Sequence, residues 1–218
     1  MSYNPFRVDN CAGAVTPNSM TRTSASSTYC VSLDEIKLFC RLPTASTVED
    51  SLLVSFIKAA ESYAEVYTRT AINRQQWQIK FDGFCGHEGD IVLPRPPLTT
   101  ASSEVTISYI EDTTAGNTTT LASTAFTIDY DSKPAVLYPS YDNEWPDPRD
   151  VRNAVTVTYY CGYSTPSQVP DAIKNWVKVR VAAMYENREA VMVGTGNFIS
   201  ELPHSFVDGL LDEFIVSI

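Results

Sequence analysis

Residues that build active sites are scarce in this sequence. It contains only two histidines, His87 and His204, which lie far apart, each beside a glycine or a proline, without HxxxH or HExxH spacing. Metal sites use such spacing to bring two imidazoles together. Because it is missing here, we expect both histidines in exposed loops. No GxSxG motif occurs, and Gly194-Thr195-Gly196 lacks the preceding strand and the following lysine of a phosphate loop. The sequence therefore predicts no catalytic residue, no metal site and no cofactor.

Disulfide pairs, long apolar runs and basic clusters are missing as well. The five cysteines are odd in number, widely spaced and without a CxxC pair, which predicts reduced thiols in a cytosolic product. No segment approaches the roughly 18 apolar residues of a membrane span or resembles a signal peptide, so we expect no membrane partner. With a net charge of −10 and no long Lys/Arg cluster, the chain has no basic groove to grip nucleic acid. The simplest interpretation of this charge is that it keeps the protein soluble. The charge is also compatible with a channel wall that repels DNA and lets it slide past.

Acidic residues and a tryptophan share one loop, residues 142–150. Its carboxylates could serve as calcium ligands, but two prolines interrupt it and EF-hand spacing is absent, so we expect a solvated turn. Trp145 lies between acidic residues and a proline, and the sequence favours neither an interface nor local packing for it. The same tryptophan and acids are the basis of one alternative, a carbohydrate-binding or hydrolytic module.

The most apolar segment is a predicted helix over residues 170–191. Pro170 suits the first turn and Asp171 favours the positive end of the helix dipole. At about 100° per residue, its apolar side chains cover roughly two thirds of the circumference, so we expect it to pack on two sides. Arg180 and Arg188 fall inside this apolar arc. Each must find a carboxylate, a carbonyl or a neighbouring subunit, because an unpaired buried charge is costly.

Other helices are predicted on both sides of a β-rich region. Ser32-Leu33-Asp34-Glu35 is a capping box that opens a helix reaching about Cys40. A second helix begins at 47–50 and runs to about Thr70, and a last one covers 203–216. The apolar face predicted for the second helix consists of Val48, Leu52, Phe56, Ala59, Ala60, Tyr63, Ala64 and Tyr67.

From residue 75 the apolar period changes from 3.6 to 2, which predicts strands. We expect short strands near 76–81, 91–93, 105–110, 126–130, 135–138 and 155–160, arranged as an antiparallel meander or small barrel. The fold class is therefore α+β, a small helical bundle with a large antiparallel β insertion. We expect residues 1–29 to form an extended arm held by a neighbouring copy, 30–73 and 163–218 to form the helical core, and 74–162 to form the insertion.

Three stretches together resemble one protein family. They are 32–37 with the helix that ends near Tyr67, Leu93-Pro94-Arg95-Pro96-Pro97-Leu98 at the start of the insertion, and 153–203, which includes Val169-Pro170-Asp171-Ala172-Ile173-Lys174. Their order and spacing are similar to those of tailed-phage head–tail connector (adaptor) proteins. The similarity covers about residues 30–215, whereas the N-terminal arm and the 141–152 loop lie outside it.

The resemblance implies a structural virion protein with no enzyme activity. It implies a dodecameric ring in the phage neck, docked on the portal protein, in contact with a downstream neck or tail protein and assembled in the host cytoplasm. Double-stranded DNA would pass through its lumen without specific binding, and about 194–218 would reach toward the portal. Candidate subunit or portal contacts are Trp176, Arg180, Arg188, Phe198, Phe206, Leu210 and Phe214. The nearest alternative is another neck component, a head-closure or tail-terminator protein, although the two long helices count against those β-dominated classes.

Overall fold

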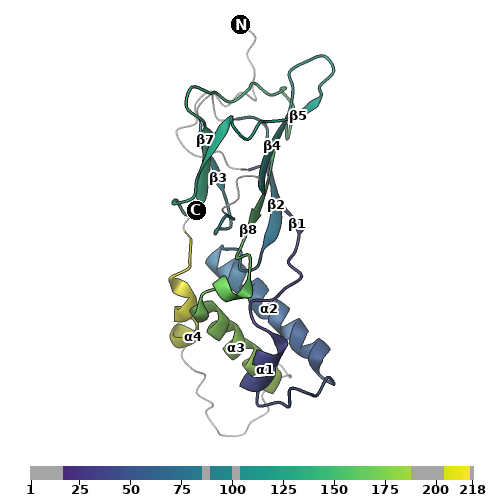
Figure 1. The fold of residues 1–218 in the computed structure, drawn as a ribbon, viewed down its shortest axis with the longest axis vertical. Helices are drawn as coiled ribbons and strands as arrows, with labels where there is room; N and C mark the ends of the chain where they lie inside the picture. The colour runs from purple at the N-terminus through teal and green to yellow at the C-terminus, as the bar shows by residue number, and fades with distance from the viewer. Residues whose placement is uncertain (1–16, 85–88, 100–103, 188–203, 217–218) are drawn as a thin grey trace. The chain divides into compact units, whose positions relative to one another are not determined.

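The computed structural model of the protein describes residues 17–84, 89–99, 104–187 and 204–216 (Figure 1). The chain divides into two compact units. The helical unit combines Ser27–Asn73 with Tyr163–Ser217, and the β unit combines Arg74–Gly162 with the N-terminal segment that ends at Ser26. Each unit is thus assembled from segments that are far apart in the sequence.

Four α-helices form the helical unit: α1 (Leu33–Phe39), α2 (Asp50–Thr68), α3 (Asp171–Glu186) and α4 (His204–Asp212). The predicted capping box at α1 is confirmed, since Ser32 Oγ accepts from Glu35 N at 3.2 Å and Glu35 Oε2 accepts from Ser32 N at 2.8 Å. Pro170 is the N-cap of α3, and the helix ends at Glu186 with Asn187 as its C-cap. His204 is the first residue of α4, so the expectation of a loop position for it is wrong.

The buried face of α2 differs from the predicted one. Leu53, Ile57, Ala60 and Ala64 form the buried stripe at helical spacing, whereas Tyr63 is 44% exposed. Val48 precedes the helix and is almost fully exposed. The predicted buried face of α2 is rotated by most of a quarter turn from the observed one. Apolar residues cover more of the circumference of α2 than one neighbouring helix can bury, and tertiary packing decides which of them are buried.

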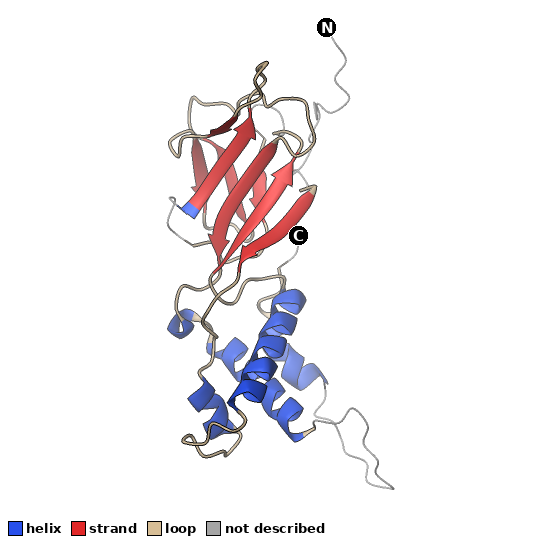
Figure 2. Ribbon diagram, turned by 90° about the vertical axis from the view of Figure 1, so that its right-hand side faces the viewer, coloured by secondary structure: helices blue, strands red, loops and turns tan. Residues whose placement is uncertain are grey.

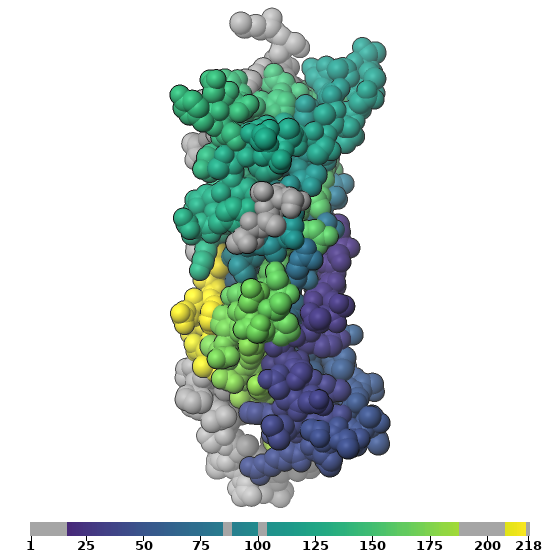
Figure 3. Space-filling view, viewed as in Figure 1, coloured from purple at the N-terminus to yellow at the C-terminus, as the bar shows by residue number. Residues whose placement is uncertain are grey.

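α3 contacts the other three helices of its own chain. Ile173, Trp176, Val177 and Val181 are almost completely buried in a core shared with α1, α2 and α4. The wide apolar arc of this helix is therefore accounted for largely within the chain. Figures 1 and 3 show α1 and α4 on the two sides of α3.

Two antiparallel sheets form the β unit, and Figure 2 shows them as two layers. The larger sheet has the order β1-β2-β8-β4-β5 and the smaller one the order β3-β7-β6. The strands are β1 (Ser19–Ser24), β2 (Gln75–Phe81), β3 (Ile91–Leu93), β4 (Val105–Ile110), β5 (Thr118–Thr120), β6 (Phe126–Asp129), β7 (Ala135–Pro139) and β8 (Val155–Cys161). The α+β class and all six predicted strands are confirmed, to within one or two residues.

The arrangement of these strands is neither the expected meander nor a barrel. β8 pairs with β2 on one side and with β4 on the other, so the last strand of the unit lies in the centre of the larger sheet. Ile79, Val157 and Ile107 are fully buried neighbours across these three strands. Tyr159 Oη donates to Pro94 O at 2.8 Å and so ties β8 to the segment that follows β3. The two inner faces pack as a sandwich.

Part of the predicted N-terminal arm belongs to the larger sheet. β1 pairs antiparallel with β2 from Ser19 opposite Lys80 to Ser24 opposite Gln76, with one irregularity before Ser24. Asn18 N donates to Lys80 O at 2.8 Å, which extends the ladder by one residue. The chain's own sheet therefore holds this segment, and the expectation that a neighbouring copy holds it is wrong for 18–24. A polar edge strand with little apolar alternation gives no period-2 signal, which is why it was missed.

Candidate functional site

The acidic loop of the β unit surrounds a buried tryptophan. Within the described residues, no group of three or more His, Cys, Asp or Glu side chains is placed to hold a metal ion. Trp145 is 2% exposed, stacks on Phe84 with ring centroids 4.9 Å apart, and donates from Nε1 to Gly89 O at 2.7 Å. A sugar-binding tryptophan must present a free ring face, so this geometry assigns Trp145 to local packing and removes the basis of the carbohydrate-binding alternative.

Two further expectations concern membrane-spanning helices and disulfides in the described regions. No helix resolved in those ranges combines the length and the apolar character that crossing a bilayer requires. Cys30, Cys40 and Cys161 form no disulfide, and burial raises the pKa of the Cys30 and Cys40 thiols above its ordinary value.

A column of aromatic rings runs between α2 and α3. Tyr67 stacks on Tyr63 with centroids 6.2 Å apart, and Tyr63 stacks on Trp176 with centroids 5.6 Å apart. The guanidinium carbon of Arg180 lies 5.7 Å from the centroid of the Tyr63 ring. Tyr63, the middle ring of this column, and Arg180 are both exposed, so a cation lies beside an aromatic ring at the surface.

The same column fixes α4. Trp176 Nε1 donates to Asp208 Oδ1 at 3.2 Å, and Tyr67 Oη donates to Asp212 Oδ1 at 2.9 Å, so two carboxylates one turn apart are each bound by an aromatic side chain. The hydrogen bond to Asp212 raises the pKa of the Tyr67 hydroxyl. Leu211 between them is fully buried. The C-terminal helix is thus anchored to the α2–α3 pair by two polar contacts around one apolar one.

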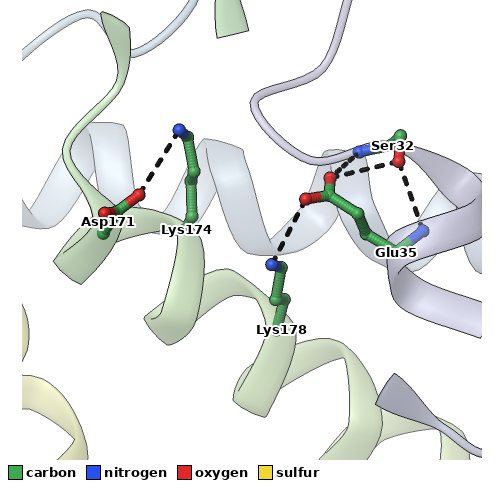
Figure 4. A network of polar contacts seen from close by, with 5 residues as sticks. All are labelled: Ser32, Glu35, Asp171, Lys174 and Lys178. Carbon is green, nitrogen blue, oxygen red and sulfur yellow. Dashed lines mark hydrogen bonds and ion pairs between the residues drawn. The ribbon is translucent and has the colours of Figure 1, made fainter. Parts of the chain in front are cut away.

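On the other side of α3, one lysine forms an ion pair with α1 and another forms an ion pair with the first turn of α3. Lys178 Nζ lies 3.5 Å from Glu35 Oε1, and Lys174 Nζ lies 3.5 Å from Asp171 Oδ1 (Figure 4). The hydrogen bonds from Ser32 and the charge of Lys178 lower the pKa of the Glu35 carboxyl. Trp176 and Lys178 are two positions apart, about 200° around a helix, so α4 and α1 contact opposite sides of α3.

Two exposed surfaces follow from this arrangement. We call the first the Arg180 surface: it lies on α2 and α3 and consists of Ala59, Tyr63, Val66, Arg180 and Ala183, all exposed. Ala59, Tyr63 and Val66 follow one another at i, i+4 and i+7, the spacing of a single helix face. Val66 is 66% exposed. An apolar stripe flanked by one cation is the composition expected of a protein contact rather than of a solvated helix face.

We call the second the Asp34 surface, on α1 and the loop after it. Its members are Asp34, Leu38, Phe39 and Val48, and Leu38 is 74% exposed. The buried Lys37 fixes this region, because its ammonium group lies 2.6 Å from Asp50 Oδ1 and donates to Ser46 O at 2.7 Å and Thr44 O at 3.2 Å. The exposed apolar side chains therefore stand on a rigid support.

The predicted contact residues fall into three groups. Trp176 is fully buried in the core of the helical unit, and Phe214 is partly buried against the same core. Arg180 is exposed rather than buried, and its guanidinium group lies beside the exposed Tyr63 ring. Leu210 is 36% exposed on α4, to which Phe206 also belongs. Arg188 and Phe198 lie outside the described residues.

Sequence reasoning missed Leu38, Phe39 and Val48 as surface candidates. One signal in the sequence could have identified Leu38 and Phe39. The seven-residue helix α1 ends in these two bulky apolar residues, and its single buried face cannot hold both. Tyr63 and Val66 were missed because the predicted wheel placed Tyr63 in the core.

The described residues thus define a two-unit α+β protein with exposed apolar surfaces on its helical unit. Residues 30–138, half of the chain, match the model of the family described as "Phage gp6-like head-tail connector protein". The chain belongs to this family. It is a structural virion protein that connects head and tail.

Three solved structures share the fold. A chain from the neck of an empty gene transfer agent particle, computed with C6 symmetry, aligns over 92% of this chain and 97% of its own, with a TM-score of 0.70 and 17% identity. A chain from the virion of the native particle aligns over 91% and 96%, with a TM-score of 0.68 and 20% identity. A chain from the native neck computed with C12 symmetry gives a TM-score of 0.60, with 18% identity over 90% and 97%. No curated protein matches the sequence.

Proposed function

We propose that this protein forms a closed ring of identical subunits, twelve in number, in the neck of a phage particle. The observation that carries the proposal is the match to the head–tail connector family over half of the chain. Fold similarity over nine tenths of the chain to subunits of a neck computed with C12 symmetry supports the ring and the number twelve. Exposed apolar surfaces on opposite sides of α3 support contact with two neighbours, as a ring requires.

The ring lies between the portal protein and a downstream neck or tail protein, and it has no enzymatic activity. Residues 30–73 and 163–218 act as the connector core, 74–162 act as an insertion, and the C-terminal segment from about residue 194 reaches toward the portal. Assembly takes place in the host cytoplasm before the tail is attached. These assignments rest on the family and on the fold, which together favour a scaffold role.

Double-stranded DNA passes through the lumen of the ring without being held. The net charge of −10 supports this assignment, because an acidic wall repels phosphate and prevents the counterion release that drives non-specific binding. We expect no retention of linear duplex DNA by the purified protein at 50 mM salt. Retention that weakens steeply as salt rises would contradict this part of the proposal.

The test is assembly on the portal. The purified protein is mixed with the portal protein of the same phage and measured by mass photometry and electron microscopy. We expect a ring of twelve copies added to the portal, and neck density below it in micrographs. A protein that stays monomeric in the presence of the portal and adds no density would contradict the proposal.

A further inference from the structure

Arg180 has an aromatic partner but, among the residues that the structure describes, no acidic one. In the ranges that the structure describes, the only contact of its guanidinium group is with the Tyr63 ring, and no carboxylate lies within ion-pair distance. The side chain is exposed, so water solvates the charge in the isolated chain. A cation held by a ring at the edge of an apolar stripe is preorganised for a carboxylate from outside.

Asp34 is its counterpart on α1. Its carboxylate is exposed and, among the described residues, makes no ion pair, whereas the adjacent Glu35 is engaged by Ser32 and Lys178. Asp34 and Leu38 are four residues apart, so both lie on one face of α1. The Asp34 surface therefore combines exposed apolar groups with one unpaired negative charge.

The two surfaces complement each other and neither complements itself. Contact between two Arg180 surfaces would bring two guanidinium groups together, and contact between two Asp34 surfaces would bring two carboxylates together. Contact between one of each pairs opposite charges and covers the exposed Val66 and Leu38. Because the surfaces lie on opposite sides of α3, this contact is heterologous and repeats from copy to copy, as in a ring.

We propose that the Arg180 surface of each subunit is covered by the Asp34 surface of the next copy, with Arg180 paired to Asp34 across the interface. This inference rests on the proposed ring and names the surfaces that close it. Val66 and Tyr63 then meet Leu38 and Phe39 in the dry centre of the contact, and the ion pair lies at its rim, where it selects the partner and sets the register.

A charge-reversal cycle tests the pairing. Arg180→Glu and Asp34→Arg are each expected to weaken ring formation by about tenfold or more, and the double variant is expected to restore most of the loss, since the pair is then reversed. Lys133→Glu, which reverses an exposed charge in the β unit, is the matched control and should form rings like the wild type. Ring fraction against protein concentration is measured with the portal present.

Two further variants keep the test informative if Asp34→Arg weakens α1. Asp34→Asn removes the charge without adding another, and Val66→Lys acts on the partner surface at an exposed position. Both should lower the ring fraction while leaving the melting temperature of the monomer unchanged.

The outcomes separate the inference from the proposed function. Normal rings from both single charge reversals would overturn the pairing and leave the ring intact. Normal rings that no longer bind the portal would also overturn it, since the Arg180 surface would then face the portal. A wild-type protein that never forms rings would overturn both proposals.

Discussion

The ammonium group of Lys37 in α1 lies 2.6 Å from Asp50 Oδ1 at the start of α2, and the lysine side chain is only 5% exposed. The ammonium group also donates to Thr44 O and Ser46 O, so one ion pair and two hydrogen bonds hold this buried cation. One buried cation thus organises the α1–α2 connection.

We expect Lys37→Met to destabilise the helical unit by about 3 kcal/mol. Methionine retains the apolar stem but leaves the carboxylate and two carbonyls without their donor. Chemical denaturation followed by circular dichroism measures the change. Lys133→Met, at an exposed position, is the control and should shift the midpoint by less than about 0.5 kcal/mol. A shift of equal size in both variants would show that Lys37 has no special role.

Glu61 predicts the pH dependence of stability in the same unit. It is 7% exposed, accepts from Cys30 N at 2.6 Å and is bound by the Asn73 side chain, and burial raises the pKa of its carboxyl. A raised pKa in the folded state means that the folded protein binds this proton more tightly than the unfolded chain. The contribution of Glu61 to stability is therefore fully present below 4.5, the pKa of this carboxyl in the unfolded chain. It is lost as pH rises through the higher pKa of the folded state.

Glu61→Gln should remove this slope, because the amide keeps an acceptor for Cys30 N without a charge to desolvate. The free energy of unfolding of wild type and variant is measured from pH 4 to 8, and we expect the variant to gain relative to wild type as pH rises. The nearby Glu65 carries a like charge, which also raises the pKa of the Glu61 carboxyl. Glu65→Gln is thus the control for a purely electrostatic effect, and identical profiles for the two variants would refute the assignment to Glu61.

Gly209 offers a stabilising substitution in α4. A methyl group at this position would meet no atom within 4 Å, and the residue is exposed. Gly209→Ala should therefore stabilise the helical unit by about 0.5–1 kcal/mol through the smaller backbone entropy of the unfolded chain. Gly162→Ala is the contrasting variant and should destabilise, because Gly162 has a φ of 91°. Thermal unfolding distinguishes them, and a loss of stability in Gly209→Ala would contradict the position of α4.

The sequence predicted local structure better than it predicted packing. Ser32 with Glu35 and Pro170 with Asp171 act within one turn, so their signals survive without knowledge of the rest of the chain. The order of the larger sheet could not be read in this way, because β8 pairs with strands that precede it by some 50 to 80 residues. The face of α2 that is buried depends on where α1, α3 and α4 dock, and Leu53 was therefore overlooked in favour of Tyr63.

The assembly argument from α3 also changes with the structure. Its apolar arc predicted neighbouring copies, yet α1, α2 and α4 of the same chain cover most of it. Arg180 is the exception, since the arc that contains it opens to solvent beside Tyr63. Periodicity indicates how much of a helix is apolar, but it does not tell an intramolecular neighbour from an intermolecular one.

Trp145 gives a prediction for the β unit. Trp145→Ala removes a buried ring stacked on Phe84 and should cost about 3–5 kcal/mol. Trp145→Phe keeps a ring against Phe84, loses the hydrogen bond to Gly89 O and should cost about 1–2 kcal/mol. Chemical denaturation of both variants measures the two losses in the free energy of unfolding. Titration of wild type with oligosaccharides should give no signal, and a signal abolished by Trp145→Phe would restore the carbohydrate-binding alternative.

The central position of β8 has a consequence for the timing of synthesis. On the ribosome, β2 and β4 emerge long before the strand that must lie between them, and the interval between α2 and α3 is longer still. The β unit cannot close until β8 has left the exit tunnel, and the core of the helical unit cannot close until α3 and α4 have followed. We expect a chain that stops before Val155 to expose the unpaired edges of β2 and β4 and to be captured by chaperones.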